Sequence, residues 1–297
     1  MRDVRSLGFI GLGVMGEPIC RNLAAKSGLP VAAFDPNPAP PERLAAAGVR
    51  RKDSPAEVAQ AADLIFLSLP DGDAVRRVCL DDEDGLMAAL EPGQVVVDTS
   101  TTPVELSRAL ALRYAKISVA FADAPVARTR AAAEAGTLSV MVGADAALFA
   151  RLQPYLGCFA SDVTLCGGTG AGQVVKQMNN MVLFQTVVAL AEALAVGRRA
   201  GVDGRVLFDT LSKGSADSFA LRNHGMKAML PDDFPARAFP ARYALKDLSY
   251  ALGLADDMGL ELRGADVARQ LLEETIANGD GDRYFPALAR VIDPRED

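Results

Sequence analysis

The chain of 297 residues contains no tryptophan, a single histidine and only four cysteines. The histidine is His224, so a catalytic base has to come from that ring, from one of the few lysines or from a carboxylate. The cysteines lack the close pairing that metal sites need, and they stand at Cys20, Cys79, Cys158 and Cys166. We therefore predict no metal site, and a reduced protein of the cytoplasm with buried thiols.

Excess positive charge and long apolar runs are also missing. The formal net charge is -7 and the sequence pI is about 4.9, which argues against nucleic acid or an anionic membrane as a partner. No uninterrupted apolar stretch is long enough to span a bilayer, and glycines break the apolar run at residues 7–16, which indicates a strand and not a signal peptide. With 50% hydrophobic residues, the chain can build one large domain or two ordinary ones.

A glycine-rich turn follows the first predicted strand. Residues 6–28 read as a short apolar strand, the pattern Gly-x-Gly-x-x-Gly and a helix, and a second strand follows at 31–34. In a dinucleotide-binding βαβ unit the first glycine permits the tight turn, the second lets the backbone approach the pyrophosphate, and the third allows close helix packing. The segment predicts a cofactor site made by Gly11, Leu12, Gly13, Val14, Met15 and Gly16.

Asp35 directly follows the second strand, about twenty residues after the glycines. A carboxylate at this place accepts hydrogen bonds from the ribose hydroxyls and repels a 2′-phosphate, which favours NAD over NADP. The alternative interpretation is a turn residue in the segment DPNP.

Strands and helices keep alternating over the first half of the chain. Further strands are predicted at 62–69, 94–97 and 117–122, with closing strands at 138–142 and 163–165 on an antiparallel edge. Such alternation predicts a parallel sheet, whose ligands bind beyond the carboxyl ends of the strands. We therefore expect Leu69, Pro70, Ser100 and Thr101 beside the cofactor and substrate, although the two hydroxyls could equally cap a helix.

The composition changes after residue 166, and from Gly170 onward only helical periods are convincing. We predict an α/β Rossmann dinucleotide-binding domain at 1–166 and an all-α domain at 167–297, which begins with its longest helix. That helix carries Lys176, Asn179 and Asn180 toward one side of a largely apolar surface. A buried ammonium is costly unless it is used, but a lysine that snorkels to solvent at a helix end is the alternative.

Four segments in order resemble the β-hydroxyacid dehydrogenase family, which includes 3-hydroxyisobutyrate dehydrogenase and tartronate semialdehyde reductase and is related to 6-phosphogluconate dehydrogenase. They are GFIGLGVMGEPICRNL, DAPVARTRAAAEAGTL, GAGQVVKQMNN and LKDL. The resemblance covers nearly the whole chain and implies a Rossmann domain joined to a helical domain by a long helix.

The same resemblance implies roles for individual residues. Lys176 would be the catalytic acid/base, oriented by Asn180, and Asn179 would contact substrate. Ser100 and Thr101 would lie by the substrate and the nicotinamide. Lys246, beside Asp247, would lie by the cofactor, although such a pair is otherwise a common solvated surface feature. Burial disfavours the charged form of a lysine, which lets it exchange a proton at working pH.

Two segments depart from the family pattern. Most members have Ser-Gly-Gly after DAPV, where this chain has Ala127, Arg128 and Thr129. The Arg-Thr pair resembles the 3-sulfolactaldehyde reductase branch, in which the arginine takes the sulfonate, but Leu183 stands where that branch supplies a serine. The segment DTSTTP is also one residue shorter than the usual motif.

The sequence therefore predicts an NAD(P)-dependent oxidoreductase that interconverts a small anionic β-hydroxy acid and its semialdehyde. Arg128 and Thr129 would bind the acid group, which is a carboxylate or, in the alternative, the sulfonate of 3-sulfolactaldehyde. The same scaffold could also serve an imine reductase, against which Lys176 and Asn180 argue, or a non-catalytic NAD-binding module. The resemblance implies a homodimer or homotetramer as well. The sequence leaves open the acid itself, the physiological direction and the size of the oligomer.

Overall fold

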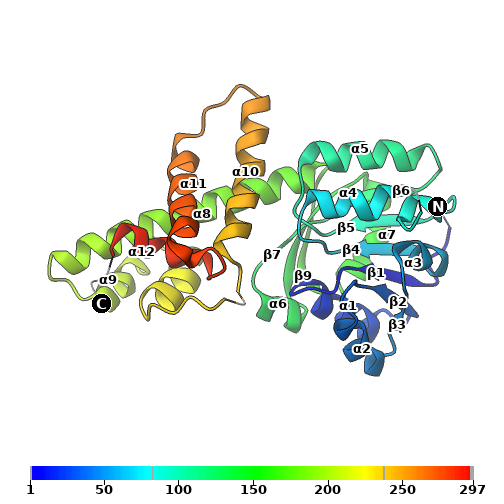
Figure 1. Ribbon diagram of the computed structural model, residues 1–297, viewed down its shortest axis with the longest axis horizontal. Coiled ribbons are helices and arrows are strands. Elements are labelled where there is room, and N and C mark those ends of the chain that lie inside the picture. The colour runs from blue at the N-terminus through cyan, green and yellow to red at the C-terminus, as the bar shows by residue number, and fades with distance from the viewer. Residues whose placement is uncertain (1, 82, 237, 295–297) are drawn as a thin grey trace. The chain divides into compact units, whose positions relative to one another are not determined.

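The computed structural model describes residues 2–81, 83–236 and 238–294. It divides into two compact units, Met1–Lys176 and Gln177–Asp297, each described by itself below (Figure 1). The predicted domain boundary after residue 166 lies in the last strand, whereas the division by compactness lies inside the long helix α8 (Ala171–Arg199).

The first unit is built on a parallel sheet. Its central strands lie in the order β3-β2-β1-β4-β5-β6. Leu7 pairs with Val31 on one side and with Leu64 on the other, so the first strand is internal. The strands of these pairings are β1 (Leu7–Ile10), β2 (Val31–Phe34), β3 (Arg50–Arg51), β4 (Leu64–Leu67), β5 (Val95–Asp98) and β6 (Ala120–Asp123). This parallel order confirms the predicted Rossmann class.

Helices cover both faces of the sheet, which explains why its strands are continuously apolar. Helices α1 and α7 share one core with Phe9 and Phe66, while α3, α4 and α5 share the other with Ile65. Figure 1 shows α4 and α5 together on one side of the strands. The helices of the unit before α8 are α1 (Gly16–Lys26), α2 (Ala39–Leu44), η1 (Ala45–Ala47), α3 (Pro55–Ala61), α4 (Gly72–Leu80), η2 (Leu86–Ala88), α5 (Val104–Ala115), α6 (Arg130–Ala135) and α7 (Ala146–Leu156).

The far edge of the sheet reverses direction, as predicted. Strand β8 (Leu138–Gly143) runs antiparallel to β6 and to the two-residue strand β7 (Val126–Ala127). Strand β9 (Ala160–Gly167) is parallel to β8, and most of its residues are partly or fully exposed, as befits an edge strand. The sequence did not predict β7, which is too short to show a period.

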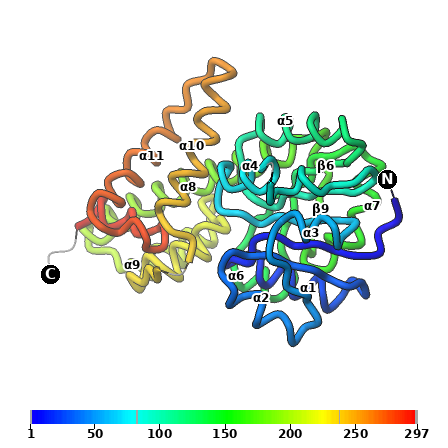
Figure 2. Tube along the Cα trace, turned by 45° about the vertical axis from the view of Figure 1, so that its right-hand side comes forward, coloured from blue at the N-terminus to red at the C-terminus, as the bar shows by residue number. Residues whose placement is uncertain are grey.

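The second unit is helical, and its described residues contain no strand longer than the bridge between Pro240 and Tyr284. Its core gathers around Phe184, Phe208 and Phe285. Figures 1 and 2 both show α10 and α11 side by side, and the two helices are in contact. Besides α8, its elements are α9 (Gly204–Leu211), η3 (Leu221–Met229), α10 (Ala241–Asp257), α11 (Arg263–Thr275), η4 (Ile276–Asp280), η5 (Phe285–Leu288) and α12 (Ala289–Ile292).

Helix α8 corrects two expectations. By length and composition alone it could cross a membrane, which the sequence did not predict. Its residues Phe184, Val187 and Leu190 are buried in the core of the second unit, so it is a core helix. Its surface is not buried all round, however, because Val182 is 57% exposed.

His224 gives the second unit a predicted sensitivity to acid. Its ring is buried, its Nδ1 meets the hydroxyl of Tyr284, and burial together with Lys227 lowers its pKa from 6.5 to about 4. The folded state therefore takes up this proton less readily than the unfolded chain. The stability that His224 contributes is complete above pH 6.5 and is lost as the pH falls toward 4, by up to about 3 kcal/mol.

We expect His224→Gln to flatten the dependence of the unfolding free energy on pH between 7 and 4.5, measured in urea. Asp98 in the first unit titrates in the same range with the opposite sign, so the difference between variant and wild type is the quantity to compare. Tyr284→Phe is the matched control, because it removes the hydroxyl and keeps the ring. Equal slopes for His224→Gln and wild type would contradict the prediction.

Candidate functional site

The three glycines of the first βα turn have different surroundings. Gly11 has φ +90°, and a Cβ there would lie 2.3 Å from Ser68 O. A Cβ on Gly16 would lie 1.9 Å from Gly11 O. A Cβ on Gly13 would meet nothing within 4 Å, and the residue is exposed together with Val14. Two glycines are therefore needed for packing, whereas Gly13 opens the loop to a ligand, as a pyrophosphate cradle requires.

Asp35 lies against this loop. Its Oδ2 accepts a hydrogen bond from Leu12 N at 2.6 Å, and its Oδ1 accepts one from Asn37 N at 2.8 Å. The turn interpretation is thus correct for one oxygen, while the other fixes the carboxylate beside the glycines. The carboxylate is therefore held next to the glycine loop, where an aspartate that accepts from ribose hydroxyls is expected.

Ser100 joins two strand-end loops. Its buried hydroxyl accepts a hydrogen bond from Leu69 N at 2.9 Å, so the loops after β4 and β5 are tied together. Thr101 is partly buried beside it. The helix-cap alternative is wrong for both hydroxyls, because the N-cap of α5 is Pro103 and the helix has no side-chain cap hydrogen bond. Leu69 also borders the glycine loop, since a Cβ on Gly11 would lie 2.9 Å from its side chain.

Arg128 sits at the reversed edge of the sheet. It has φ +87°, a value that glycine adopts readily and other residues rarely do. Its guanidinium donates to Thr137 O at 2.6 Å, to Ser161 Oγ at 2.8 Å and to Asp162 Oδ2 at 2.7 Å. Thr129 follows as the N-cap of α6, without a side-chain cap bond. In this conformation the arginine is bound to the chain's own acceptors.

Polar residues of α8 and α10 form a chain of hydrogen bonds in the second unit. Asn179 Nδ2 donates to Asn180 Oδ1 at 3.0 Å, and Asn180 Nδ2 donates to Asp247 Oδ2 at 2.7 Å. Lys246 Nζ lies 3.0 Å from Asp247 Oδ1, and the Asp247 side chain is only 4% exposed. The surface alternative for this pair is therefore wrong.

Lys176 precedes Asn180 by one helical turn on the same helix and is 9% exposed, so it does not snorkel to solvent.

Comparisons with known proteins show the family of the chain. Residues 6–168 match the family model of the NAD binding domain of 6-phosphogluconate dehydrogenase, and residues 170–292 match the model for NAD-binding of NADP-dependent 3-hydroxyisobutyrate dehydrogenase. A 2-(hydroxymethyl)glutarate dehydrogenase of Eubacterium barkeri is 35% identical over 96% of this chain and 94% of its own length. The chain belongs to the β-hydroxyacid dehydrogenase family.

Two further relatives of the family cover the chain from end to end. The 2-hydroxy-3-oxopropionate reductase of Escherichia coli is 33% identical over 97% of both proteins. The structure of the 3-hydroxyisobutyrate dehydrogenase of Mycobacterium tuberculosis with L-serine superposes with a TM-score of 0.88 at 30% identity, covering 98% of this chain and 100% of the other. As a β-hydroxyacid dehydrogenase, the chain is an NAD(P)-dependent oxidoreductase of hydroxyl groups.

Two buried carboxylates at the carboxyl ends of the strands were not among the predicted residues. Asp98 and Asp123 end the neighbouring strands β5 and β6 and are paired in register. Burial raises the pKa of Asp98 to about 7, against hydrogen bonds from Ser100, and burial also raises the pKa of Asp123. Each is the last residue of an apolar strand, and Asp35 lies directly after one, so this shared pattern could have identified them. Among the described residues, no group of histidine, cysteine and carboxylate side chains fits a metal ion.

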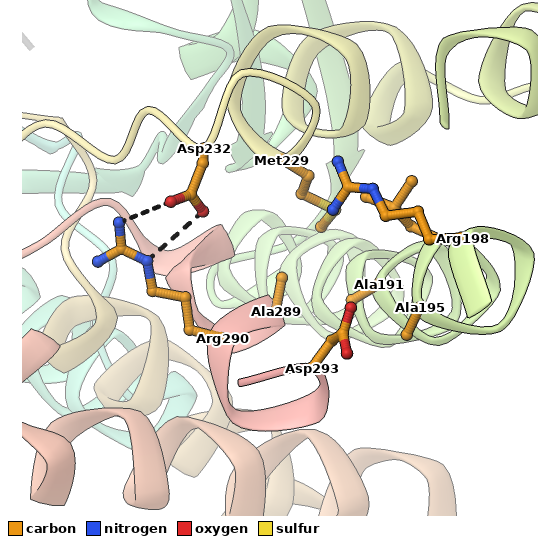
Figure 3. Close-up of a pocket in the computed structure, with 9 residues that line it drawn as sticks. Ala191, Ala195, Arg198, Met229, Asp232, Ala289, Arg290 and Asp293 are labelled. Carbon is orange, nitrogen blue, oxygen red and sulfur yellow. Dashed lines mark hydrogen bonds and ion pairs between the residues drawn. The ribbon is translucent and has the colours of Figure 1, made fainter. Parts of the chain in front are cut away.

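A small cavity in the second unit is unrelated to the predicted site. Figure 3 shows it between α8 and the C-terminal segment, with Ala191, Arg198, Met229 and Asp232 in its lining and Arg290 paired to Asp232 at 3.0 Å. None of the residues predicted for cofactor or substrate lines it.

Proposed function

We propose that the protein transfers hydride between NAD and a small β-hydroxy acid or its semialdehyde, with Lys176 as general acid/base. The observation that carries this proposal is a lysine buried to 9% exposure, one turn from an asparagine whose amide is held by Asp247. A lysine kept from solvent beside fixed amides is suited to proton exchange with a substrate oxygen.

Proton transfer, orientation and substrate contact are assigned to different residues. The nicotinamide, when bound, supplies or takes the hydride. In reduction, protonated Lys176 donates its proton to the carbonyl oxygen, and in oxidation the neutral amine accepts the proton of the hydroxyl. Asn180 orients the lysine and Asn179 contacts substrate. Ser100, whose hydroxyl accepts from Leu69 N and also hydrogen-bonds to Asp98, would lie by the substrate.

Cofactor binding is assigned to residues at the strand ends and to one lysine. The glycine loop would hold the pyrophosphate, and Asp35 would accept from the ribose hydroxyls and select NAD. Leu69, Pro70 and Thr101 would border the nicotinamide half. Lys246, held by Asp247 and by the rings of Tyr243 and Tyr250, would add a positive charge to the cofactor side.

Arg128 and Thr129 would bind the acid group of the substrate. The guanidinium has one carboxylate partner, Asp162, and both side chains are more than a third exposed. Such exposed pairs are worth little, so a substrate anion can replace Asp162 at small cost. The relatives reported above are named for carboxylate substrates, which supports a carboxylate. The Arg-Thr pair at 128–129 favours the second candidate, 3-sulfolactaldehyde.

The test is NADH oxidation with methylmalonate semialdehyde, tartronate semialdehyde and 3-sulfolactaldehyde at equal concentrations. We expect a carboxylate semialdehyde to have the highest kcat/KM. Arg128→Ala should raise KM for it by about tenfold to 100-fold, because a charge-assisted hydrogen bond contributes about 1.5–3 kcal/mol.

Arg130→Ala is the matched control, since Arg130 is a nearby exposed arginine paired with Glu134 within its own helix. Turnover of 3-sulfolactaldehyde alone would favour the second candidate. An unchanged KM in Arg128→Ala would mean that Arg128 does not bind the acid group and serves only as the partner of Asp162. Tight NADH binding without turnover of any substrate would favour a non-catalytic module.

A further inference from the structure

The first turn of α8 is attached to the end of strand β6 by a buried carboxylate. Asp123 Oδ1 accepts from Gly170 N at 2.6 Å, and its Oδ2 accepts from Gln173 N at 2.9 Å. Asp123 is fully buried and lies 47 residues before Gly170 in the sequence. It therefore acts as a helix cap supplied by the sheet, and not by the residue that precedes the helix.

Gln173 attaches the same turn to the loop after β5. Its Nε2 donates to Ser100 O at 2.8 Å, and its Oε1 accepts from Thr102 N at 3.1 Å. The side chain is fully buried, and both halves of its amide are used. Since the Ser100 hydroxyl holds Leu69 N, the helix is linked through one residue to the loops after β4 and β5.

Close backbone contact completes the attachment. A Cβ on Gly172 would lie 2.3 Å from Met141 O and 2.8 Å from Asp123 Oδ2. The helix backbone therefore rests directly on β8, without a side chain between them. Gly170, Gly172 and Gln173 are thus fixed against β6, β8 and the loop after β5, which leaves the turn little freedom to slide or rotate.

We propose that Asp123 and Gln173 are positioning residues for Lys176. Lys176 follows Gln173 by three residues, about 4.5 Å along the axis of a rigid helix, so the contacts of Gln173 set the height and rotation at which the ammonium is presented. The inference rests on the proposed function of Lys176. Its consequence is that the acid/base is aligned by the same loops that are assigned to the cofactor.

Ordinary stabilisation of the fold is the competing explanation, and the chain contains a matched control for it. Gln94 is also a fully buried glutamine, and its Nε2 donates to Ala59 O and Ala62 O at 2.6 Å each. It lies directly before β5, at the opposite end of that strand from Asp98 and Ser100. Gln173→Ala and Gln94→Ala thus remove equivalent side chains, but of the two only Gln173 belongs to α8.

The experiment compares thermal stability, NADH affinity by fluorescence, and kcat and KM for these two variants. We expect both to lower Tm, while Gln173→Ala alone lowers kcat by about 100-fold with NADH affinity retained, because small misplacements of a reacting group have effects of this size. The primary isotope effect with deuterated NADH should remain or rise, since the impaired step is chemistry.

A second pair keeps the test decisive if Gln173→Ala does not fold. Asp123→Asn leaves one acceptor for the two helix amides and should lower kcat, whereas Asp145→Asn, at the ordinary N-cap of α7, should not. Equal kcat losses in the Gln173 and Gln94 variants, or in the two aspartate variants, would overturn the positioning role. If Lys176→Ala remained fully active, the proposed function itself would fail, and that outcome is separate from these comparisons.

Discussion

Lys176→Ala is expected to lower kcat by about 10²- to 10⁴-fold while NADH still binds, since this is the usual contribution of a positioned general acid/base. The side chain is only 9% exposed, so the access of solvent to its amine is limited. Lys176→Arg should be almost as poor, because a guanidinium does not lose its proton in proteins and cannot act as the base in oxidation. The measurement is steady-state kinetics in both directions, with NADH affinity by fluorescence.

Lys227→Ala is the control for this prediction. Lys227 is an exposed lysine that donates to Asn223 one turn earlier in its own helix, and its removal should leave kcat unchanged. A primary amine added to the assay should partly restore Lys176→Ala if the missing group is the proton donor. Wild-type activity in Lys176→Ala would show that another group handles the proton, and the assignment would then be wrong.

Replacing the glycines of the first turn by alanine is expected to separate binding from folding. Gly16→Ala should lower the unfolding free energy by about 3 kcal/mol or more, because its Cβ would lie 1.9 Å from Gly11 O and backbone cannot move aside easily. Gly13→Ala should leave stability nearly unchanged, since its Cβ meets nothing within 4 Å. The same methyl group should weaken NADH binding at least about tenfold by filling the space that a pyrophosphate needs.

Gly253→Ala serves as the control, because this exposed position of α10 also has open space around a Cβ. It should leave NADH affinity unchanged and raise stability by up to about 1 kcal/mol through helix propensity. The measurements are urea unfolding and titration with NADH. Undiminished NADH binding by Gly13→Ala would mean that the dinucleotide is not held at this turn.

Local sequence patterns predicted most strands of the first unit. The exact bounds of some strands differ, because they depend on the local conformation and on contacts with residues distant in sequence. The strand at 31–34 was placed to the residue. The strand expected at 62–69 is limited to Leu64–Leu67, and just before it the carboxylate of Asp63 accepts from Arg5 N and pairs with Arg2 at 2.6 Å. The strand expected from residue 117 begins at Ala120, since Ser118 has φ +59° and turns the chain.

The predicted site shows the same division. The glycine loop and Asp35 follow from the spacing within one βαβ unit, and the structure places them in contact. The hold of Asp162 on Arg128 joins residues 34 apart, and that of Asp247 on Asn180 joins residues 67 apart. No periodicity connects such positions, so only the fold shows which acceptors each side chain meets.

The internal position of β1 has a consequence for how the protein is made. During synthesis β1 and β2 leave the ribosome early, but the other edge of β1 waits for β4, whose last residue is Leu67. Until then the strand Leu7–Ile10 exposes unpaired backbone and an apolar surface, which invites pairing with other chains. Parallel pairing over such separations is slow. We expect a demand on chaperones while this first unit is being synthesised.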